Sequence, residues 1–182
     1  TGLGKDVLWK RMRVALSHPA ASEVSRKTLD GPPGTPWTRP TSPDSALRSL
    51  DRTVTELEQA YRVPREKILL LGFSQGACLA AEYVTRNPRR YGGLFVFSGA
   101  LIGPPGMERQ YPGSFEQMPV FIGGSDVDPW VEHDLLKDTA SVFEKMGADV
   151  DFRTYPGMAH TVNQGEIEAL ARDGVLVERR RR

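Results

Sequence analysis

The feature that most constrains this chain is an apolar, strand-like run that passes directly into a helix-like segment. Residues 68–80 read ILLLGFSQGACLA: four apolar residues precede Gly72, Ser74 stands alone, and an alanine-rich stretch follows Gly76. A sharp strand-to-helix turn strains its central residue, and glycines on both sides remove Cβ atoms that would collide. The pattern therefore predicts a turn that presents the Ser74 hydroxyl at one edge of a sheet.

Short apolar runs alternate with amphipathic segments along the rest of the chain. This alternation is typical of a parallel sheet covered by helices. The sequence predicts strands near residues 13–17, 67–71, 94–97, 120–122 and 150–155. It predicts helices over residues 43–61, 75–87 and 131–147.

Length and charge limit the classes of protein to which the chain can belong. Its 182 residues fit a single domain over residues 1–182, with residues 175–182 as a basic tail. A formal net charge of +1 gives no large field, which argues against nucleic acid or an anionic membrane as partner. No apolar run approaches the roughly 18 residues that a membrane span requires. The single cysteine, Cys78, and a first segment without a signal-peptide core favour a cytoplasmic location.

Two long segments have neither helical nor strand periodicity. Residues 18–43 and 99–119 are rich in proline and glycine and are predicted to be loops. Each follows a predicted strand, so both belong to the carboxyl edge of the sheet, where open α/β sheets bind ligands.

The residues Gly72–Gly76 match G-x-S-x-G, a motif in which the serine is a nucleophile. A helix that begins at Gln75 points its first N–H groups toward the place where a substrate carbonyl would become an oxyanion. The motif is short, and the alternative interpretation is an ordinary tight turn with an exposed serine. A nucleophilic serine also needs a base and an acid, which follow it in the chain.

The chain has three histidines from which a general base could come. His18 precedes the serine motif and is out of order for this arrangement. His133 lies on the polar side of a predicted helix, where a solvated surface role is expected. His160 follows the last predicted strand, at the same edge of the sheet as the serine, and is the predicted base.

Two aspartates in the segment GSDVDPWV are candidates for the acid. A carboxylate at this position could accept the imidazole N–H, fix its tautomer and stabilise the imidazolium. Asp128 is preferred because it lies farther along the loop and Pro129 makes the turn rigid. Asp126 is the alternative, with hydrogen bonding to the backbone of the turn as its other role.

Three ordered motifs, LGFSQGA, GSDVDPWV and YPGMAHTVN, resemble those of the phospholipase/carboxylesterase family of α/β-hydrolases. That family includes acyl-protein thioesterases and small bacterial carboxylesterases, and the resemblance extends over about residues 43–170. It implies an α/β-hydrolase fold, with a mostly parallel central sheet and helices on both faces. It also implies that Ser74 is the nucleophile, that His160 is the base and that Asp128 orients it.

The resemblance implies a small-molecule ester or thioester substrate and no metal or organic cofactor. It also suggests a homodimer. The balanced charge and the lack of a long apolar run predict no nucleic acid and no integral membrane contact. The predicted function is hydrolysis of carboxylic esters through an acyl-enzyme. Two alternatives stay open: an acyl-thioesterase or other acyl hydrolase with the same three residues, and a non-catalytic, hydrolase-like binding module.

The N-terminal segment departs from the family pattern. Family members have a His-Gly-x-Gly segment after an early strand, and the nearest match here is TGLG at residues 1–4. This match would make Leu3 the second oxyanion donor beside Gln75, but it leaves no residues for the preceding strand. Either the chain is truncated at its N-terminus or its sheet lacks an interior strand.

Overall fold

The computed structural model describes residues 43–179, with side chains described as far as Arg172. These residues belong to two compact units, which divide between Ala60 and Tyr61. The first unit contributes helix α3 (Pro43–Gln59), which begins at the predicted residue. The strand predicted near residues 13–17 lies outside the described residues, as does the loop predicted before Pro43.

The second unit alternates strands and helices along the chain. Its strands are β1 (Leu69–Phe73), β2 (Gly93–Phe97), β3 (Pro119–Ser125) and β4 (Asp149–Tyr155). Its helices are α4 (Gln75–Arg86), α5 (His133–Lys145), α6 (Gln164–Arg179) and the short 3-10 helix η1 (Arg65–Lys67). The strands and helices predicted for this part of the chain are confirmed, with small shifts at their ends.

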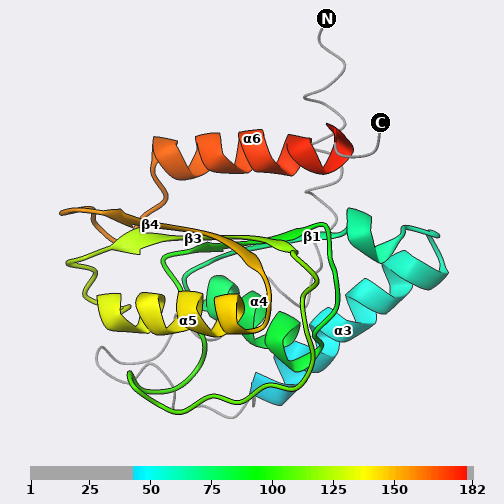
Figure 1. The fold of residues 1–182 in the computed structure, drawn as a ribbon, viewed down its shortest axis with the longest axis horizontal. Coiled ribbons are helices and arrows are strands. Elements are labelled where there is room, and N and C mark those ends of the chain that lie inside the picture. The colour runs from blue at the N-terminus through cyan, green and yellow to red at the C-terminus, as the bar shows by residue number, and fades with distance from the viewer. Residues whose placement is uncertain (1–42, 180–182) are drawn as a thin grey trace, which may run out of the picture. The chain divides into compact units, whose positions relative to one another are not determined.

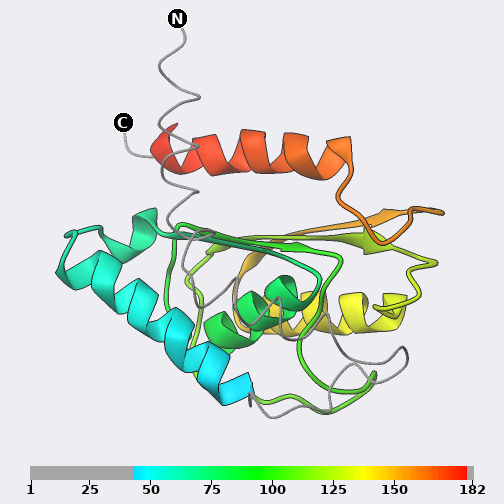
Figure 2. The same ribbon diagram turned by 180° about the vertical axis from the view of Figure 1, so that it is seen from behind.

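The strands form one parallel sheet in the order β1-β2-β3-β4. Helices α4 and α5 cover one face of this sheet, and α6 covers the other face (Figures 1 and 2). The predicted parallel sheet with helices on both faces is therefore confirmed. Because all the strands point the same way, the loops that follow them meet at one edge, where the predicted site residues also lie.

The core consists of two apolar layers, one on each face of the sheet. Toward α6, Phe121 packs against Phe95 and Phe97, with ring centroids 6.1 Å and 5.7 Å apart, and Ala169 of α6 closes this cluster. Both faces of β2 are buried, which explains its continuous apolar sequence. On the other face the buried side chains come from the inner strands, α4 and α5: Ala77, Val84, Leu94, Val96, Ile122, Leu136 and Phe143.

Helix α6 is a difference between expectation and structure, because no helix is predicted after the last strand. It begins with a reciprocal cap: the Asn163 N–H donates to Glu166 Oε2 at 2.9 Å, and the Glu166 N–H donates to Asn163 Oδ1 at 3.0 Å. The helix continues to Arg179, into the segment expected as a basic tail. Gly174 does not interrupt it, since one glycine costs a helix only about 1 kcal/mol.

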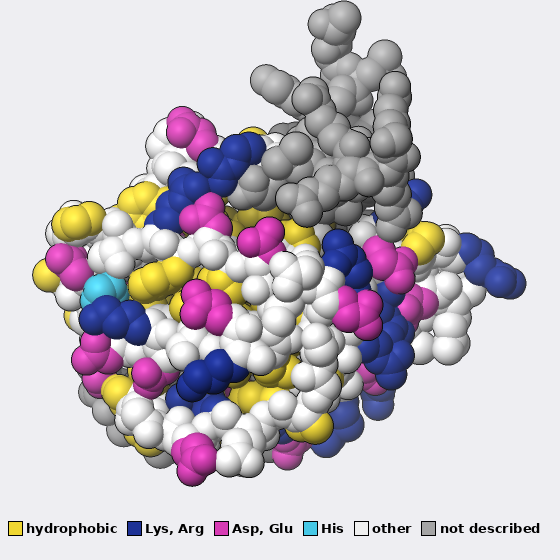
Figure 3. Space-filling model, in the orientation of Figure 1, with side chains coloured by type: hydrophobic (Ala, Val, Ile, Leu, Met, Phe, Trp, Pro, Cys, Tyr) yellow, Lys and Arg dark blue, Asp and Glu magenta, His cyan; other side chains and the backbone are white. Residues whose placement is uncertain are grey.

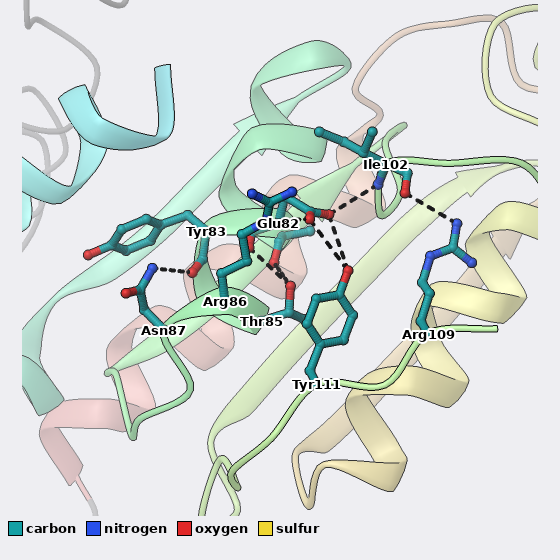
Figure 4. Close-up of polar contacts among 9 residues, drawn as sticks. Glu82, Tyr83, Thr85, Arg86, Asn87, Ile102, Arg109 and Tyr111 are labelled. Atoms are coloured by element: carbon teal, nitrogen blue, oxygen red, sulfur yellow. Dashed lines mark hydrogen bonds and ion pairs between the residues drawn. The ribbon is translucent and has the colours of Figure 1, made fainter. Parts of the chain in front are cut away.

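The long connection between β2 and β3 contains no helix or strand, as predicted, but side chains fasten it to α4 (Figure 4). Glu82 of α4 is 3% exposed, and its carboxylate accepts from Arg86 Nε at 2.7 Å. The Ile102 N–H and the Tyr111 hydroxyl of the connection also donate to it, each at 3.4 Å. One buried carboxylate thus ties this loop to the helix that begins at Gln75.

The surface of the molecule carries both signs of charge. On the face seen in Figure 3, acidic and basic side chains are interspersed with apolar ones. This distribution agrees with the formal net charge of +1. Within the described part of the chain, no helix has the length and apolar character needed to cross a membrane.

Candidate active site

Ser74 occupies the turn between β1 and α4, and its backbone is strained. Its φ of 54° and ψ of −123° lie outside the regions that residues with a Cβ commonly adopt. The Ser74 N–H donates to the Phe97 carbonyl oxygen at 2.9 Å, so the adjacent strand β2 holds the turn in place. The half-buried serine therefore lies at the carboxyl edge of the sheet.

The two glycines of the motif have different roles. A Cβ on Gly72 would collide with the backbone of Gly76 and Ala77, so the turn requires glycine there. A Cβ on Gly76 would meet nothing within 4 Å. The prediction that both glycines relieve a collision is confirmed for Gly72 and wrong for Gly76, because α4 directs the Gly76 position into open space.

His160 lies in the loop between β4 and α6 and contacts two of the other predicted residues. Its Nε2 is 2.8 Å from Ser74 Oγ, and its Nδ1 is 2.7 Å from Asp128 Oδ2. The Phe73 ring lies beside the imidazole, with centroids 4.9 Å apart and planes tilted by 40°. The three side chains form one hydrogen-bonded series in the order serine, histidine, aspartate.

Asp128 is the buried end of this series. Its side chain is 1% exposed, whereas that of His160 is 18% exposed. Its second oxygen, Oδ1, accepts the N–H groups of Trp130 at 2.8 Å and Val131 at 3.3 Å. The carboxylate is therefore held by its own turn while Oδ2 faces the imidazole.

Asp126, the alternative acid, is bonded elsewhere. Its Oδ1 accepts the Gly157 N–H at 2.8 Å, which links the loop after β3 to the loop that carries His160.

His133 is half-buried, and its Nε2 lies 2.8 Å from Thr154 Oγ1. Its side chain is therefore more enclosed than the solvated surface position that the sequence predicts. In the part of the chain that the structure describes, no group of three or more His, Cys, Asp or Glu side chains could hold a metal ion.

Of the two residues predicted to bind an oxyanion, the structure describes Gln75. Gln75 is the first residue of α4, directly after the strained serine, where helix N–H groups point out of the helix end. Leu3 lies outside the described residues, as does His18.

Cys78, one turn into α4, is not exposed as a nucleophile would be. Burial raises the pKa of its thiol, and its Sγ accepts the Ala100 N–H at 3.4 Å.

Sequence reasoning missed two buried polar residues next to this site. Ser98, at the end of β2, donates its hydroxyl to the Thr161 carbonyl oxygen at 3.4 Å. Glu166 is 0% exposed and caps α6 three residues after Asn163. The spacing Asn-x-x-Glu is a signal for the start of a helix and could have revealed Glu166, whereas nothing local distinguishes Ser98.

The residues of this site lie within a stretch that matches a known family. Residues 42–172 match the family model described as Phospholipase/Carboxylesterase. Acyl-protein thioesterase 1 of Saccharomyces cerevisiae is 33% identical over 132 residues, which cover 70% of this chain and 56% of that protein. Acyl-protein thioesterase 1 of Debaryomyces hansenii is 30% identical over 123 residues, which cover 67% and 53%.

Solved structures resemble the chain in the same way. The phospholipase/carboxylesterase of Dyadobacter fermentans superposes with a TM-score of 0.68 at 39% identity, covering 76% of this chain and 65% of that one. SOBER1 of Arabidopsis thaliana shares the fold, with a TM-score of 0.62 at 21% identity and coverages of 81% and 72%.

The parallel sheet, the helices on both faces and these superpositions define an α/β-hydrolase fold. Since the family model covers most of the sequence, the chain belongs to the phospholipase/carboxylesterase family. It spans about half the length of the acyl-protein thioesterases that it matches.

Proposed function

We propose that the chain hydrolyses carboxylic esters, with Ser74 as nucleophile, His160 as general base and Asp128 as the carboxylate that orients the base. The observation that carries the proposal is the pair of hydrogen bonds, 2.8 Å and 2.7 Å long, that joins the three side chains. These distances are within the range that a base needs to accept the proton of a nucleophile.

The reaction proceeds in two halves. His160 Nε2 takes the hydroxyl proton while Ser74 Oγ attacks the acyl carbon, and the tetrahedral intermediate collapses to an acyl-enzyme as the alcohol leaves with that proton. Water then attacks the acyl carbon as His160 takes its proton, and that proton passes to Ser74 Oγ as the acid departs. The Gln75 N–H binds the oxyanion, and Leu3 would supply the second N–H. Loss of one such donor costs roughly 100- to 1000-fold in turnover.

The surroundings of the series support a substrate with an apolar acyl group. Phe73, Val127 and Trp130 are neighbours in sequence of Ser74 and Asp128, and they are 40%, 60% and 67% exposed. Exposed apolar side chains next to a reactive group offer a surface that an acyl chain can cover. A thioester is the second candidate, because matched relatives are named acyl-protein thioesterases. Matched oxoester and thioester series of increasing acyl length measure both preferences.

Covalent labelling tests the proposal most directly. A fluorophosphonate probe should modify Ser74, because it reacts with a serine that has an adjacent base. The Ser74→Ala variant should remain unlabelled, and peptide mass spectrometry locates the adduct. A folded wild-type chain that takes up no probe would favour the non-catalytic binding module.

A pair of aspartate variants tests the assignment of the acid. Asp128→Asn should lower turnover of an aryl ester by about 10⁴-fold, because the imidazole loses the partner that sets its tautomer. Asp126→Asn keeps an oxygen for the Gly157 N–H and should cost less than about tenfold, since one neutral hydrogen bond is worth roughly 0.5–1.5 kcal/mol. The opposite ranking would make Asp126 the acid.

A further inference from the structure

The loop that carries His160 has no regular structure of its own, yet hydrogen bonds from three neighbouring elements hold it. Asp126 accepts the N–H of Gly157 near the start of the loop at 2.8 Å. Ser98 donates to the carbonyl oxygen of Thr161 at 3.4 Å. Glu166 accepts the N–H of Asn163 at the end of the loop at 2.9 Å.

Glu166 differs from an ordinary helix cap because it is buried. A glutamate at this position of a cap usually reaches its N–H from the surface, but the Glu166 side chain is 0% exposed. Its Oε2 accepts the Asn163 N–H, whereas its Oε1 has no hydrogen-bond partner among the described residues. Burying a carboxylate with one good partner is costly, so its position needs a reason beyond starting α6.

The position of Glu166 is set by the strand that leads to the acid. A Cβ on Gly123 of β3 would collide with Glu166 Oε1 and would lie 3.1 Å from its Cγ. Glycine at this strand position thus makes room for the carboxylate. Strand β3 ends at Ser125, two residues beyond Gly123, and the loop that follows it carries Asp128. The Glu166 side chain therefore lies between the loop of the base and the strand of the acid.

We propose that Glu166 is a positioning residue that fixes the separation of His160 and Asp128 by holding the end of the base loop against β3. The inference rests on the proposed function for its consequence in catalysis, since the hydrogen bonds of Glu166 go to Asn163 and not to Ser74 or His160. The hydrogen bond from the Gly157 N–H to Asp126 holds the other end of the same loop. His160, which contacts Asp128, therefore lies in the chain between two residues whose N–H groups are held, Gly157 and Asn163.

Variants of Glu166 that differ in reach and in acceptor capacity test the proposal. Glu166→Ala should lower kcat for a short-chain aryl ester by about 10- to 100-fold, because small misplacements of reacting groups are costly. KM should change by less than about threefold, since Glu166 does not touch substrate. Glu166→Gln keeps an oxygen for the Asn163 N–H and should stay within about threefold of wild type. Glu166→Asp is one methylene shorter and should resemble Glu166→Ala.

Glu168→Ala is the matched control, because Glu168 lies on the same helix but is exposed and bonds only its neighbour Gln164 in the described contacts. It should retain wild-type kcat. A second readout, independent of turnover, is the downfield proton NMR signal of the bond between His160 Nδ1 and Asp128. This signal should broaden or vanish in Glu166→Ala and persist in Glu166→Gln and Glu168→Ala.

The outcomes separate this inference from the proposed function. An active wild type whose Glu166→Ala variant keeps full kcat overturns the inference alone. If the wild type neither hydrolyses esters nor binds the fluorophosphonate, the proposed function fails. The positioning role is then tested by the NMR signal alone, and an unchanged signal in Glu166→Ala refutes it. If Glu166→Ala does not fold, the comparison of Glu166→Gln with Glu166→Asp decides, and equal kcat values for these two variants refute it.

Discussion

Ser74 and Ser98 both have positive φ angles, of 54° and 46°, at the carboxyl ends of adjacent strands. Each strained residue is held by the next strand of the sheet: the Ser74 N–H donates to the Phe97 carbonyl at 2.9 Å, and the Ser98 N–H donates to the Gly123 carbonyl at 2.8 Å. Such conformations cost of order 1–3 kcal/mol each and persist where their surroundings over-determine them. The parallel sheet stabilises the strained edge from which the candidate site is built.

The two glycines of the serine motif should respond differently to alanine. Gly72→Ala places a Cβ against the backbone of the first turn of α4, which cannot yield, so we expect loss of folding or of the turn. Gly76 lies in α4, and the Cβ of Gly76→Ala would meet nothing within 4 Å, so this substitution should stabilise the chain by roughly 0.5–1 kcal/mol. Urea unfolding of both variants measures the effect. Equal destabilisation by the two substitutions would contradict this account of the turn.

Helix α4 carries the buried Glu82, and the strength of its link to the β2–β3 connection depends on charge. The pair of Glu82 with Arg86 is asymmetric, since their side chains are 4% and 47% exposed. Removing the exposed arginine leaves a buried carboxylate with weaker partners, whereas removing the carboxylate leaves a guanidinium that water can solvate. Burial and the Glu82 charge together raise the pKa of the Tyr111 phenol, which keeps it a hydrogen-bond donor.

Arg86→Met should therefore lower the free energy of unfolding by about 1–3 kcal/mol. Adding Glu82→Gln to that variant should recover part of the loss, because the buried charge is gone. As a control, Lys137→Met breaks an ion pair in which both side chains are exposed and should change stability by less than about 0.5 kcal/mol. Urea midpoints provide the measurement, and equal effects of Arg86→Met and Lys137→Met would refute the asymmetry.

Helix α6 should make stability depend on pH through Glu166. Burial raises the pKa of this carboxyl above its ordinary value of 4.5, although the Asn163 N–H partly opposes the shift. The folded chain then keeps a proton that the unfolded chain has lost, so stability falls as pH rises from 4.5 through the raised pKa. Glu166→Gln cannot titrate and should lose less stability between pH 4.5 and neutrality. Urea midpoints across this range measure the slope, and a variant that follows the wild-type slope would contradict the prediction.

In the α/β unit as a whole, the four parallel strands bring distant parts of the sequence to one edge. Ser74 follows β1, Ser98 follows β2, Asp128 follows β3 and His160 follows β4. The loops after neighbouring strands are adjacent because the strand order equals the chain order. Each strand is thus followed by one of these polar residues at the same edge, and the loop between β4 and α6 brings His160 to Ser74 although β4 and β1 lie at opposite ends of the sheet.

Assembly remains a prediction for the whole molecule. The family resemblance suggests a homodimer, and exposed apolar side chains such as Met107 and Ile167, 50% and 46% exposed, are of the kind that an interface covers. We expect light scattering to give a mass twice that of the 20.2 kDa chain. A mass of one chain at micromolar concentration would contradict the prediction.

The sequence by itself determined the alternation of strands and helices, the turn at Ser74 and the candidates His160 and Asp128. These features depend on local periodicity and on short motifs, which act over a few neighbouring residues. It did not show which of Asp126 and Asp128 contacts His160, and it did not lead to a prediction of α6.

Only the tertiary structure decided which polar groups meet. The Asp126 bond to Gly157, the Ser98 bond to Thr161 and the approach of Glu166 to Gly123 join residues 31, 63 and 43 positions apart. Such contacts depend on strand order, register and the packing of α6, because hydrogen bonds and burial are set by distances in space rather than along the chain.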